Sequence, residues 1–107
     1  MLPSVNKMAV LKILIDRDKP MKCVEIQQAL KEKYGFKISM GRVSAYAKDL
    51  SIYEYVFSSR TNEFIPNGTR RINYSITEEG KEYYKELRLE YIKYVNTANR
   101  VLGLPLV

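Results

Sequence analysis

The stretch "RINYSITEEGKEYY", residues 71–84, changes its hydrophobic period halfway along. Up to Ile76, apolar and polar residues alternate as in a half-buried β-strand. From Thr77 onward the spacing of apolar residues is helical. Thr77 is a favourable N-cap, and Glu78 and Glu79 follow it at the positive end of the helix. The stretch therefore predicts a strand that runs directly into a helix of about 24 residues.

A β-hairpin is predicted to end in this strand. Residues 53–60 and 70–76 both show strand patterns, and Asn67-Gly68 between them is a turn signal. We expect the second strand to bury a face made of Ile72, Tyr74 and Ile76. The arginines at the two shoulders of the hairpin are Arg60, Arg70 and Arg71.

Three shorter helices are predicted in the first half of the chain. Ser4 caps the first, which ends near Asp16. The second covers about residues 23–34 and stops at Gly35, and Ser39 caps the third. The expected buried residues are Val5, Met8, Leu11, Leu14 and Ile15 in the first helix, Val24 or Cys23, Ile26, Ala29, Leu30 and Tyr34 in the second, and Val43, Tyr46, Ala47 and Leu50 in the third.

The outward face of the third helix is made of small residues and two cations. These residues are Gly41, Arg42, Ser44, Ala45 and Lys48. Small side chains let a helix approach a grooved partner closely. Residues 33–71 hold seven basic and three acidic residues, a net charge of +4, whereas residues 72–107 are neutral with five of each. We therefore expect the middle of the chain to meet a polyanion.

Two segments resemble known DNA-binding proteins. "ISMGRVSAYAKDLSIYEYV", residues 38–56, resembles the recognition-helix segment of MarR- and PadR-type winged-helix regulators, and "INYSITEEGKEYY" is similar to their junction between wing and closing helix. The matching positions in the first segment are Ser39, Val43, Leu50 and Tyr55-Val56. Glu54 stands where these regulators usually carry Gly, so we expect a differently built turn there. Ala45 stands where an extra Arg is common.

The resemblance implies an α+β, mainly α fold. A winged helix-turn-helix domain would cover residues 1–77, and a C-terminal helix and tail for dimerisation would cover residues 78–107. It also implies that the third helix enters the DNA major groove and that the wing lies on the flanking backbone. Arg42 would either read guanine or hold a phosphate. The expected DNA-binding residues are Ser39, Met40, Gly41, Arg42, Ser44, Ala45, Lys48, Arg60, Arg70 and Arg71.

The last helix carries an apolar seam with alternating spacings of three and four residues. Its members are Tyr84, Leu87, Tyr91, Tyr94, Ala98 and Val101. This spacing is typical of coiled coils and predicts a homodimer. The alternative is a helix that folds back across the first helix. Residues 103–107, "GLPLV", are expected to lie against the partner or the first helix.

Several classes of function are disfavoured by composition. The chain has no His, one Cys and no glycine-rich phosphate loop, so we expect neither an enzyme nor a cofactor or metal. Cys23 is expected to be a small buried residue, with a redox sensor as the alternative. No apolar run reaches the roughly 20 residues of a membrane span, and no signal-peptide pattern opens the chain. A cytoplasmic protein is expected, in the host cytoplasm if the source is a virus.

The leading hypothesis is a sequence-specific, homodimeric regulator of transcription. Abundant Lys, Glu, Ile and Tyr without His or Trp are typical of hyperthermophile usage, and we expect a regulator of archaeal or archaeal-virus type. The alternative is a winged-helix protein–protein module, which Phe64 and Ile65 at the hairpin tip would favour. A small phenolic or drug-like effector between the domain and its last helix stays possible, although the sequence shows no convergent polar pocket.

Overall fold

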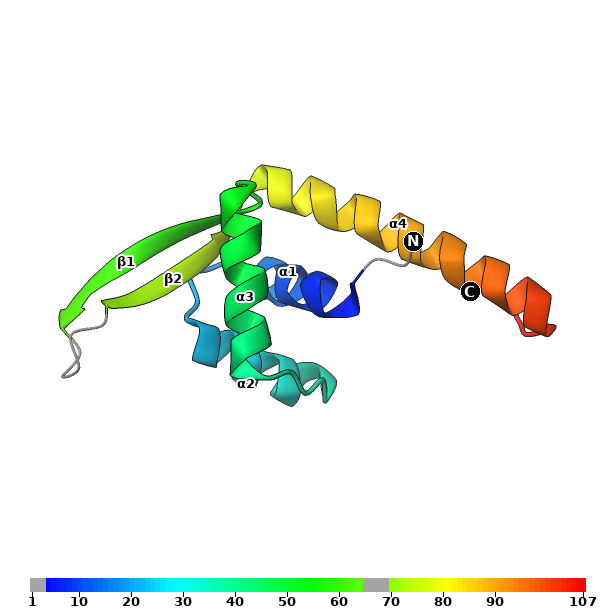
Figure 1. Cartoon of the computed structure of the whole chain (residues 1–107), viewed down its shortest axis with the longest axis horizontal. Helices are drawn as coiled ribbons and strands as arrows, with labels where there is room; N and C mark the ends of the chain where they lie inside the picture. Colours follow the sequence, from blue (N-terminus) through cyan, green and yellow to red (C-terminus); the bar gives the residue numbers. More distant parts are fainter. Residues whose placement is uncertain (1–3, 65–69) are drawn as a thin grey trace.

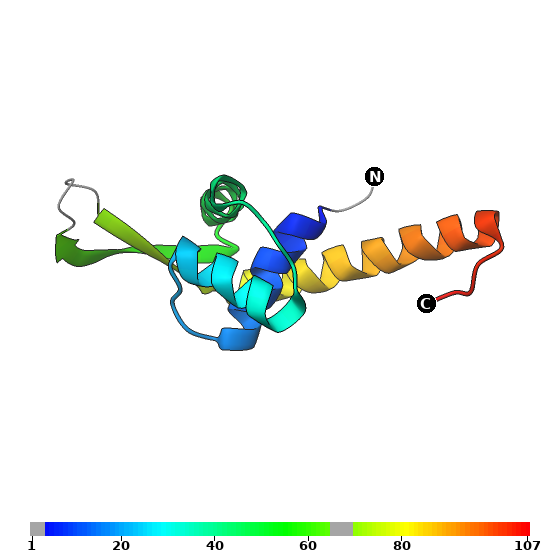
Figure 2. The same ribbon diagram turned by 90° about the horizontal axis from the view of Figure 1, so that it is seen from below.

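The computed structural model describes residues 4–64 and 70–107, with the backbone alone for residues 61–64, 70 and 71. The elements follow in the order α1 (Val5–Arg17), α2 (Cys23–Tyr34), α3 (Met40–Ile52), β1 (Val56–Phe64), β2 (Arg70–Ile76) and α4 (Glu78–Leu102). The first three helices form a body from which the hairpin and α4 extend in opposite directions (Figures 1 and 2). The molecule measures 56 × 26 × 21 Å. The predicted α+β, mainly helical winged fold is confirmed.

Helix α1 lies at the centre of the body and contacts α2, α3, α4 and β2. Ser4 caps it as predicted, since its hydroxyl accepts a hydrogen bond from the N–H of Lys7. The prediction that α1 buries a single apolar stripe was wrong in part. Val10 and Ile13 are also fully buried, whereas Val5 at the open end is 44% exposed. A helix with neighbours on several sides buries more than one stripe, and an amphipathic pattern cannot show this.

Helices α2 and α3 begin and end where the sequence indicated. Gly35 ends α2 in the left-handed conformation (φ 64°), and the Ser39 hydroxyl accepts a hydrogen bond from the N–H of Arg42 (3.2 Å) at the start of α3. The predicted buried residues of the two helices are confirmed at Ile26, Ala29, Leu30, Val43, Ala47 and Leu50. Of the two alternatives at the start of α2, Cys23 packs against the core and Val24 is exposed. Tyr34 was predicted inside but is 48% exposed at the end of α2.

The hairpin pairs β1 with β2 in antiparallel register, with Val56 opposite Ile76 and Arg60 opposite Ile72. Met21 joins the edge of β2 by an isolated bridge, since its N–H and C=O bond to the backbone of Tyr74 at 2.9 and 2.8 Å. Tyr74 is buried, and Ile72 and Ile76 pack against the core, as predicted. The predicted turn at Asn67-Gly68, Ile65 and the side chain of Phe64 lie outside the described residues.

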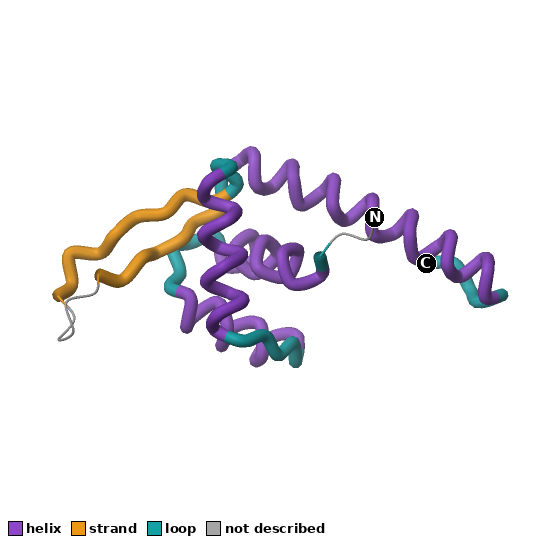
Figure 3. The backbone as a smooth tube through the Cα atoms, in the orientation of Figure 1, coloured by secondary structure: helices purple, strands orange, loops and turns teal. Residues whose placement is uncertain are grey.

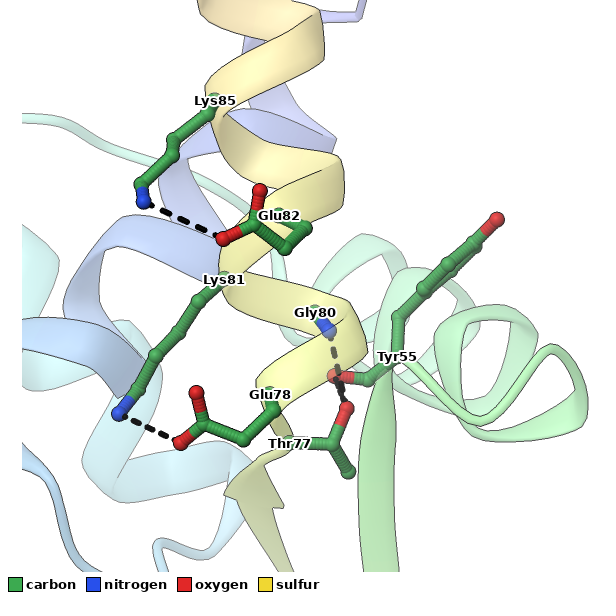
Figure 4. Close-up of polar contacts among 7 residues, drawn as sticks. All are labelled: Tyr55, Thr77, Glu78, Gly80, Lys81, Glu82 and Lys85. Carbon is green, nitrogen blue, oxygen red and sulfur yellow. Dashed lines mark hydrogen bonds and ion pairs between the residues drawn. The ribbon is translucent and has the colours of Figure 1, made fainter.

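The junction between β2 and α4 is tied to the start of β1 (Figure 4). The Thr77 hydroxyl accepts a hydrogen bond from the N–H of Gly80 (2.9 Å) and donates to the carbonyls of Tyr55 (2.9 Å) and Glu54 (2.8 Å). Thr77 is thus an N-cap and a brace between three elements. This explains why the strand passes into the helix without a loop.

Glu54, in the turn before β1, has the left-handed conformation (φ 63°) that normally favours glycine. The turn before β1 thus holds a Glu in a backbone conformation that normally favours glycine, and the expectation of a differently built turn stays a prediction. The carbonyl of Glu54 is held there by the Thr77 hydroxyl.

Helix α4 packs on α1 in its first half and extends past the body in its second half (Figure 1). Residues 103–107 then turn back along α4 (Figure 3). The Asn99 side chain donates to the carbonyl of Pro105 (2.8 Å), and the Asn96 side chain pairs with the N–H (2.9 Å) and C=O (3.2 Å) of Val107. The tail was expected against the first helix or a partner; in the structure it lies on its own helix, because two asparagines bind its backbone.

Candidate nucleic-acid interface

Helix α3 presents one continuous exposed face, opposite the buried Val43, Ala47 and Leu50. The exposed residues are Met40, Gly41, Arg42, Ser44, Ala45 and Lys48, together with the capping Ser39. Helical spacing therefore separated the two sides of α3 correctly. The face has a low profile, because Gly, Ala and Ser lie between the two long cations.

This face of α3 is positively charged. Among the described residues, no carboxylate lies within 4.0 Å of the charged nitrogens of Arg42 or Lys48. The nearby Asp49 lies 3.7 Å from Lys7 of α1, which offsets its charge. Both cations are therefore available to an anionic partner.

The capping hydroxyl of Ser39 has a structural role at the start of this face. Because it accepts from the N–H of Arg42, it fixes the first turn of α3 and with it the position of that arginine. A contact of Ser39 with a partner would use its O–H or its backbone.

The wing places Arg60 at the middle of β1, exposed and opposite Ile72 in the register. Directly opposed residues share a face of a hairpin, so Arg60 lies on the face that carries Ile72 and Tyr74. Arg70 and Arg71 begin β2, and the backbone of Arg70 pairs with Phe64. The structure describes only the backbone of these two arginines.

A cleft of about 490 Å³ separates α3 from the wing. It is lined by Lys22, Cys23, Val24, Met40, Ser44, Ile72 and Tyr74. Lys22 was missed from the sequence, although a cation at the N-terminus of the first helix of a helix-turn-helix is a usable signal. It lies at the N-cap of α2, where the Glu25 carboxylate already accepts a hydrogen bond from its N–H (2.9 Å).

Cys23 lines the same cleft and is half-buried. Burial raises the pKa of its thiol, and a hydrogen bond with Ser44 opposes this only in part. The thiol is therefore protonated at neutral pH, which fits a small packing residue better than a redox sensor.

The predicted dimer seam divides between two environments. Leu87 is only 8% exposed and belongs to the core, and Tyr84 packs beside it. Tyr91 and Ala98 are partly exposed, while Tyr94 (50%) and Val101 (80%) are open to solvent. The first half of the seam thus closes the body, and the second half has no neighbour within the described chain apart from the returning tail.

A second hollow of about 310 Å³ lies between α1, the end of α2 and α4. Its walls are mainly apolar and include Val5, Met8, Ala9, Lys12, Tyr34, Phe36 and Tyr84. The amine of Lys12 and the hydroxyl of Tyr34 both bond to Asp16. This is where a small effector was considered, and the polar groups at its edge are already occupied.

Asp16 joins the ends of α1 and α2. Burial would raise the pKa of its carboxyl, but hydrogen bonds from Tyr34, Lys12 and Lys33 outweigh burial and hold the pKa at about 2. The charged nitrogens lie 2.9 Å (Lys12) and 3.0 Å (Lys33) from its oxygens. This cluster is structural and lies apart from the face of α3.

Within residues 4–64 and 70–107, no group of three or more potential ligand side chains could hold a metal ion. In the same part of the chain, no helix is long and apolar enough to cross a membrane.

The sequence matches no protein-family model and no curated protein sequence. Solved structures do match. A PadR family transcription regulator from Clostridium difficile superposes with a TM-score of 0.69 over 94% of this chain and 100% of that chain, at 24% identity. The fold is that of PadR-type regulators. A transcriptional regulator from Clostridium thermocellum matches at 25% identity and a TM-score of 0.73, over 89% of this chain and 87% of that one.

One PadR structure includes DNA. Bacillus subtilis PadR in complex with operator DNA matches 78% of this chain and 46% of its own, with a TM-score of 0.65 and 20% identity. The PadR-type fold explains the long C-terminal helix that follows the wing.

Proposed function

We propose that the chain is a sequence-specific double-stranded DNA-binding regulator of transcription that acts as a homodimer. The observation that carries this proposal is the exposed face of α3, low in profile and cationic, beside an extended hairpin with three arginines. The PadR-type fold supports it, as does the operator DNA bound to a protein of that fold.

Helix α3 fits the major groove because an α-helix of about 10–12 Å diameter matches a groove about 12 Å wide. In helix-turn-helix proteins the N-terminal residues of the recognition helix contact base edges. Arg42 lies in the first turn of α3, so it either reads guanine or clamps a phosphate, and we favour the phosphate. Lys48 lies nearly two helical turns after Arg42 and faces the phosphate backbone of the DNA.

The wing binds the flanking backbone through Arg60, Arg70 and Arg71. The cleft between α3 and β2 separates the two contact regions. In this arrangement the cations provide affinity for the DNA. The uncharged residues of the exposed face let α3 approach the DNA closely; these are Ser39, Met40, Gly41, Ser44 and Ala45.

Dimerisation occurs through the C-terminal unit, residues 78–107, and DNA binding through residues 1–77. The exposed seam of distal α4 supports this division. A two-fold dimer would place the recognition helices about 34–36 Å apart, one turn of duplex, and would require a pseudo-palindromic site. The proposed dimer residues are those of the predicted seam that stay accessible, Tyr91, Tyr94, Ala98 and Val101, because Leu87 and Tyr84 already pack in the body.

The alternative function is a protein–protein module without DNA binding. Phe57 on the wing is 63% exposed, and Tyr53 at the end of α3 is 64% exposed, which is unusual for a surface that meets phosphates. An effector in the hollow between α1 and α4 is a further possibility. The proposed source is an archaeon or an archaeal virus, with action in the cytoplasm, and the composition supports only its thermophilic character.

Titration of duplex binding against salt tests the proposal. If the five cations of α3 and the wing each neutralise a phosphate on both copies, affinity should fall about a hundred-thousandfold between roughly 50 and 200 mM salt. A random duplex serves as the non-specific competitor. Binding that is absent at low salt, or that does not respond to salt, would rule out DNA as the partner.

A further inference from the structure

The edge of α3 that faces α1 carries further charged and polar side chains. Arg42, Tyr46 and Asp49 follow one another at spacings of four and three residues, so they line one edge of this helix. The first turn of α1 lies beside this edge. The Ser4 hydroxyl donates a hydrogen bond to the Tyr46 hydroxyl (3.2 Å), and the Lys7 amine lies 3.7 Å from the Asp49 carboxylate. Two helices that are distant in the sequence thus share one polar edge.

Two cations converge on this edge, one from each helix. A hydrogen bond from Ser4 lowers the pKa of the Tyr46 hydroxyl and outweighs the effect of burial, and the charges of Arg42 and Lys7 lower this pKa further. Both cations therefore lie near the same hydroxyl. Each belongs to the first turn of its helix, where its backbone N–H donates to the hydroxyl of the capping serine. An anion placed along this edge thus meets positive charge from both helices.

The ion pair between Lys7 and Asp49 is loose and open to solvent. Its charged atoms are 3.7 Å apart, whereas the two lysines bound to Asp16 lie 2.9 and 3.0 Å from that carboxylate. The side chain of Asp49 is 48% exposed, and a hollow of about 300 Å³ beside the pair gives the lysine room to move. Ion pairs this open to solvent contribute little to stability. The fold therefore does not require that Lys7 stay on Asp49.

Asp49 is the only acidic residue in the sequence of α3 (Met40–Ile52). On a helix proposed to meet DNA, its carboxylate repels the phosphate backbone. It also competes with the DNA for one amine, because Lys7 can neutralise either Asp49 or a phosphate. The pair therefore withholds one positive charge from the edge of α3, and the charge returns when Asp49 releases the amine.

We propose that Lys7 is a further phosphate-binding residue and that Asp49 limits this contact by holding its amine; this rests on the DNA binding proposed above. Release of Lys7 to the DNA backbone adds one phosphate contact per copy to those of α3 and the wing. Phosphate contacts supply essentially all of the affinity for non-specific DNA. Asp49 therefore limits how tightly the protein holds DNA of any sequence, which leaves more of the protein free to find a specific site.

Salt-dependent binding to a random duplex tests the role of Asp49. Asp49→Asn keeps the size of the side chain and removes its charge, so the Lys7 amine is free to bind phosphate. Affinity should rise about tenfold near roughly 50 mM salt, and the slope of log affinity against log salt should steepen by about one per copy. Asp18→Asn is the matched control, because it removes the same charge from an exposed side chain at the opposite end of α1. The control should leave the slope unchanged.

A double variant assigns the gain in affinity to Lys7. Asp49→Asn should steepen the salt slope in the unaltered chain but not in a chain that also carries Lys7→Gln. Equal gains in the two backgrounds would show that the carboxylate acts through repulsion alone, and would overturn the proposal. A loss of affinity on Asp49→Asn that is confined to a specific site would show that the carboxylate reads a base, which would overturn it as well. Circular dichroism checks that each variant is folded.

The results separate this proposal from the DNA binding on which it rests. If the unaltered chain binds the duplex and Asp49→Asn behaves like Asp18→Asn, the role of the Lys7–Asp49 pair is overturned and DNA binding stands. An unaltered chain that binds no duplex at low salt would overturn both.

Discussion

Gly80 shows at the scale of one residue why the "TEEG" string belongs at this junction. The first turn of α4 passes so close to β1 that a β-carbon on Gly80 would lie 1.9 Å from the carbonyl oxygen of Tyr55 and 2.8 Å from a methyl of Ile76. A backbone atom is the main obstacle, so the neighbour cannot move aside easily. The glycine is required for the approach of two elements, and its own φ is not positive.

We predict that Gly80→Ala destabilises the protein by about 2 kcal/mol or more, because the helix must move away from Tyr55. Gly41→Ala is the control: it lies in a helix with nothing within 4 Å of a built β-carbon and should gain about 0.5–1 kcal/mol from helix propensity. Urea unfolding of both variants measures the difference. Equal effects of the two substitutions would show that the close approach is not rigid.

Asp16 predicts a dependence of stability on pH. Its folded pKa of about 2 lies below the ordinary 3.8, so the carboxylate stabilises the fold above pH 3.8, and this contribution is lost as pH falls toward 2. The shift corresponds to about 2 kcal/mol. Asp16→Asn should therefore cost about that much at pH 7 and little at pH 2, measured by denaturant unfolding at each pH.

Asp18→Asn gives the comparison for this measurement. Asp18 is exposed at the C-cap of the same helix in a left-handed conformation that Asn tolerates. The Asp18→Asn variant should lose little stability at pH 7 or at pH 2. A loss at pH 7 equal to that of Asp16→Asn would contradict the role given to the Asp16 cluster.

At the scale of elements, the sequence predicted the features that depend on residues close to one another in the chain, such as helix caps. Ser4, Ser39 and Thr77 are caps because their hydroxyls accept backbone N–H bonds a few residues on, a relation visible in the sequence. Tyr34 was misplaced because periodicity gives a buried stripe but not how far a neighbouring helix covers it. The exposed face of α3 could be predicted, because its seven residues follow one helical repeat.

Helix α3 is expected to contact the DNA through its two exposed cations. Arg42→Ala and Lys48→Ala should each weaken binding to a specific site by about 1–3 kcal/mol while leaving the fold intact, since both side chains are exposed. Fluorescence anisotropy with specific and random duplexes measures the effect. A base contact lowers affinity for the specific duplex alone, and a phosphate contact lowers affinity for both.

Lys31→Ala is the matched control for α3, because it removes one exposed cation from the end of α2 and the same formal charge. It should bind almost as the unaltered chain does. If Arg42→Ala and Lys48→Ala bind no worse than Lys31→Ala, α3 does not contact the DNA.

At the scale of the whole molecule, the wing and α4 extend from the body in opposite directions (Figure 2). Under the proposed function, the DNA contacts and the dimer contacts are therefore separate surfaces, so a substitution in one should leave the other intact. The folded-back tail and the hollow beside Tyr84 could not be predicted from the sequence. Both depend on where the ends of α4 lie relative to distant residues, and no local pattern encodes that.

Footprinting of the purified protein on the DNA upstream of its own gene tests the central claim most directly. A dimer with one recognition helix per half-site predicts a protected, pseudo-palindromic site whose half-sites lie about one duplex turn apart, roughly 10–10.5 base pairs centre to centre. Loss of that protection in Arg42→Ala would assign it to α3. Absence of a protected site at low salt, where phosphate contacts are strongest, would contradict the account.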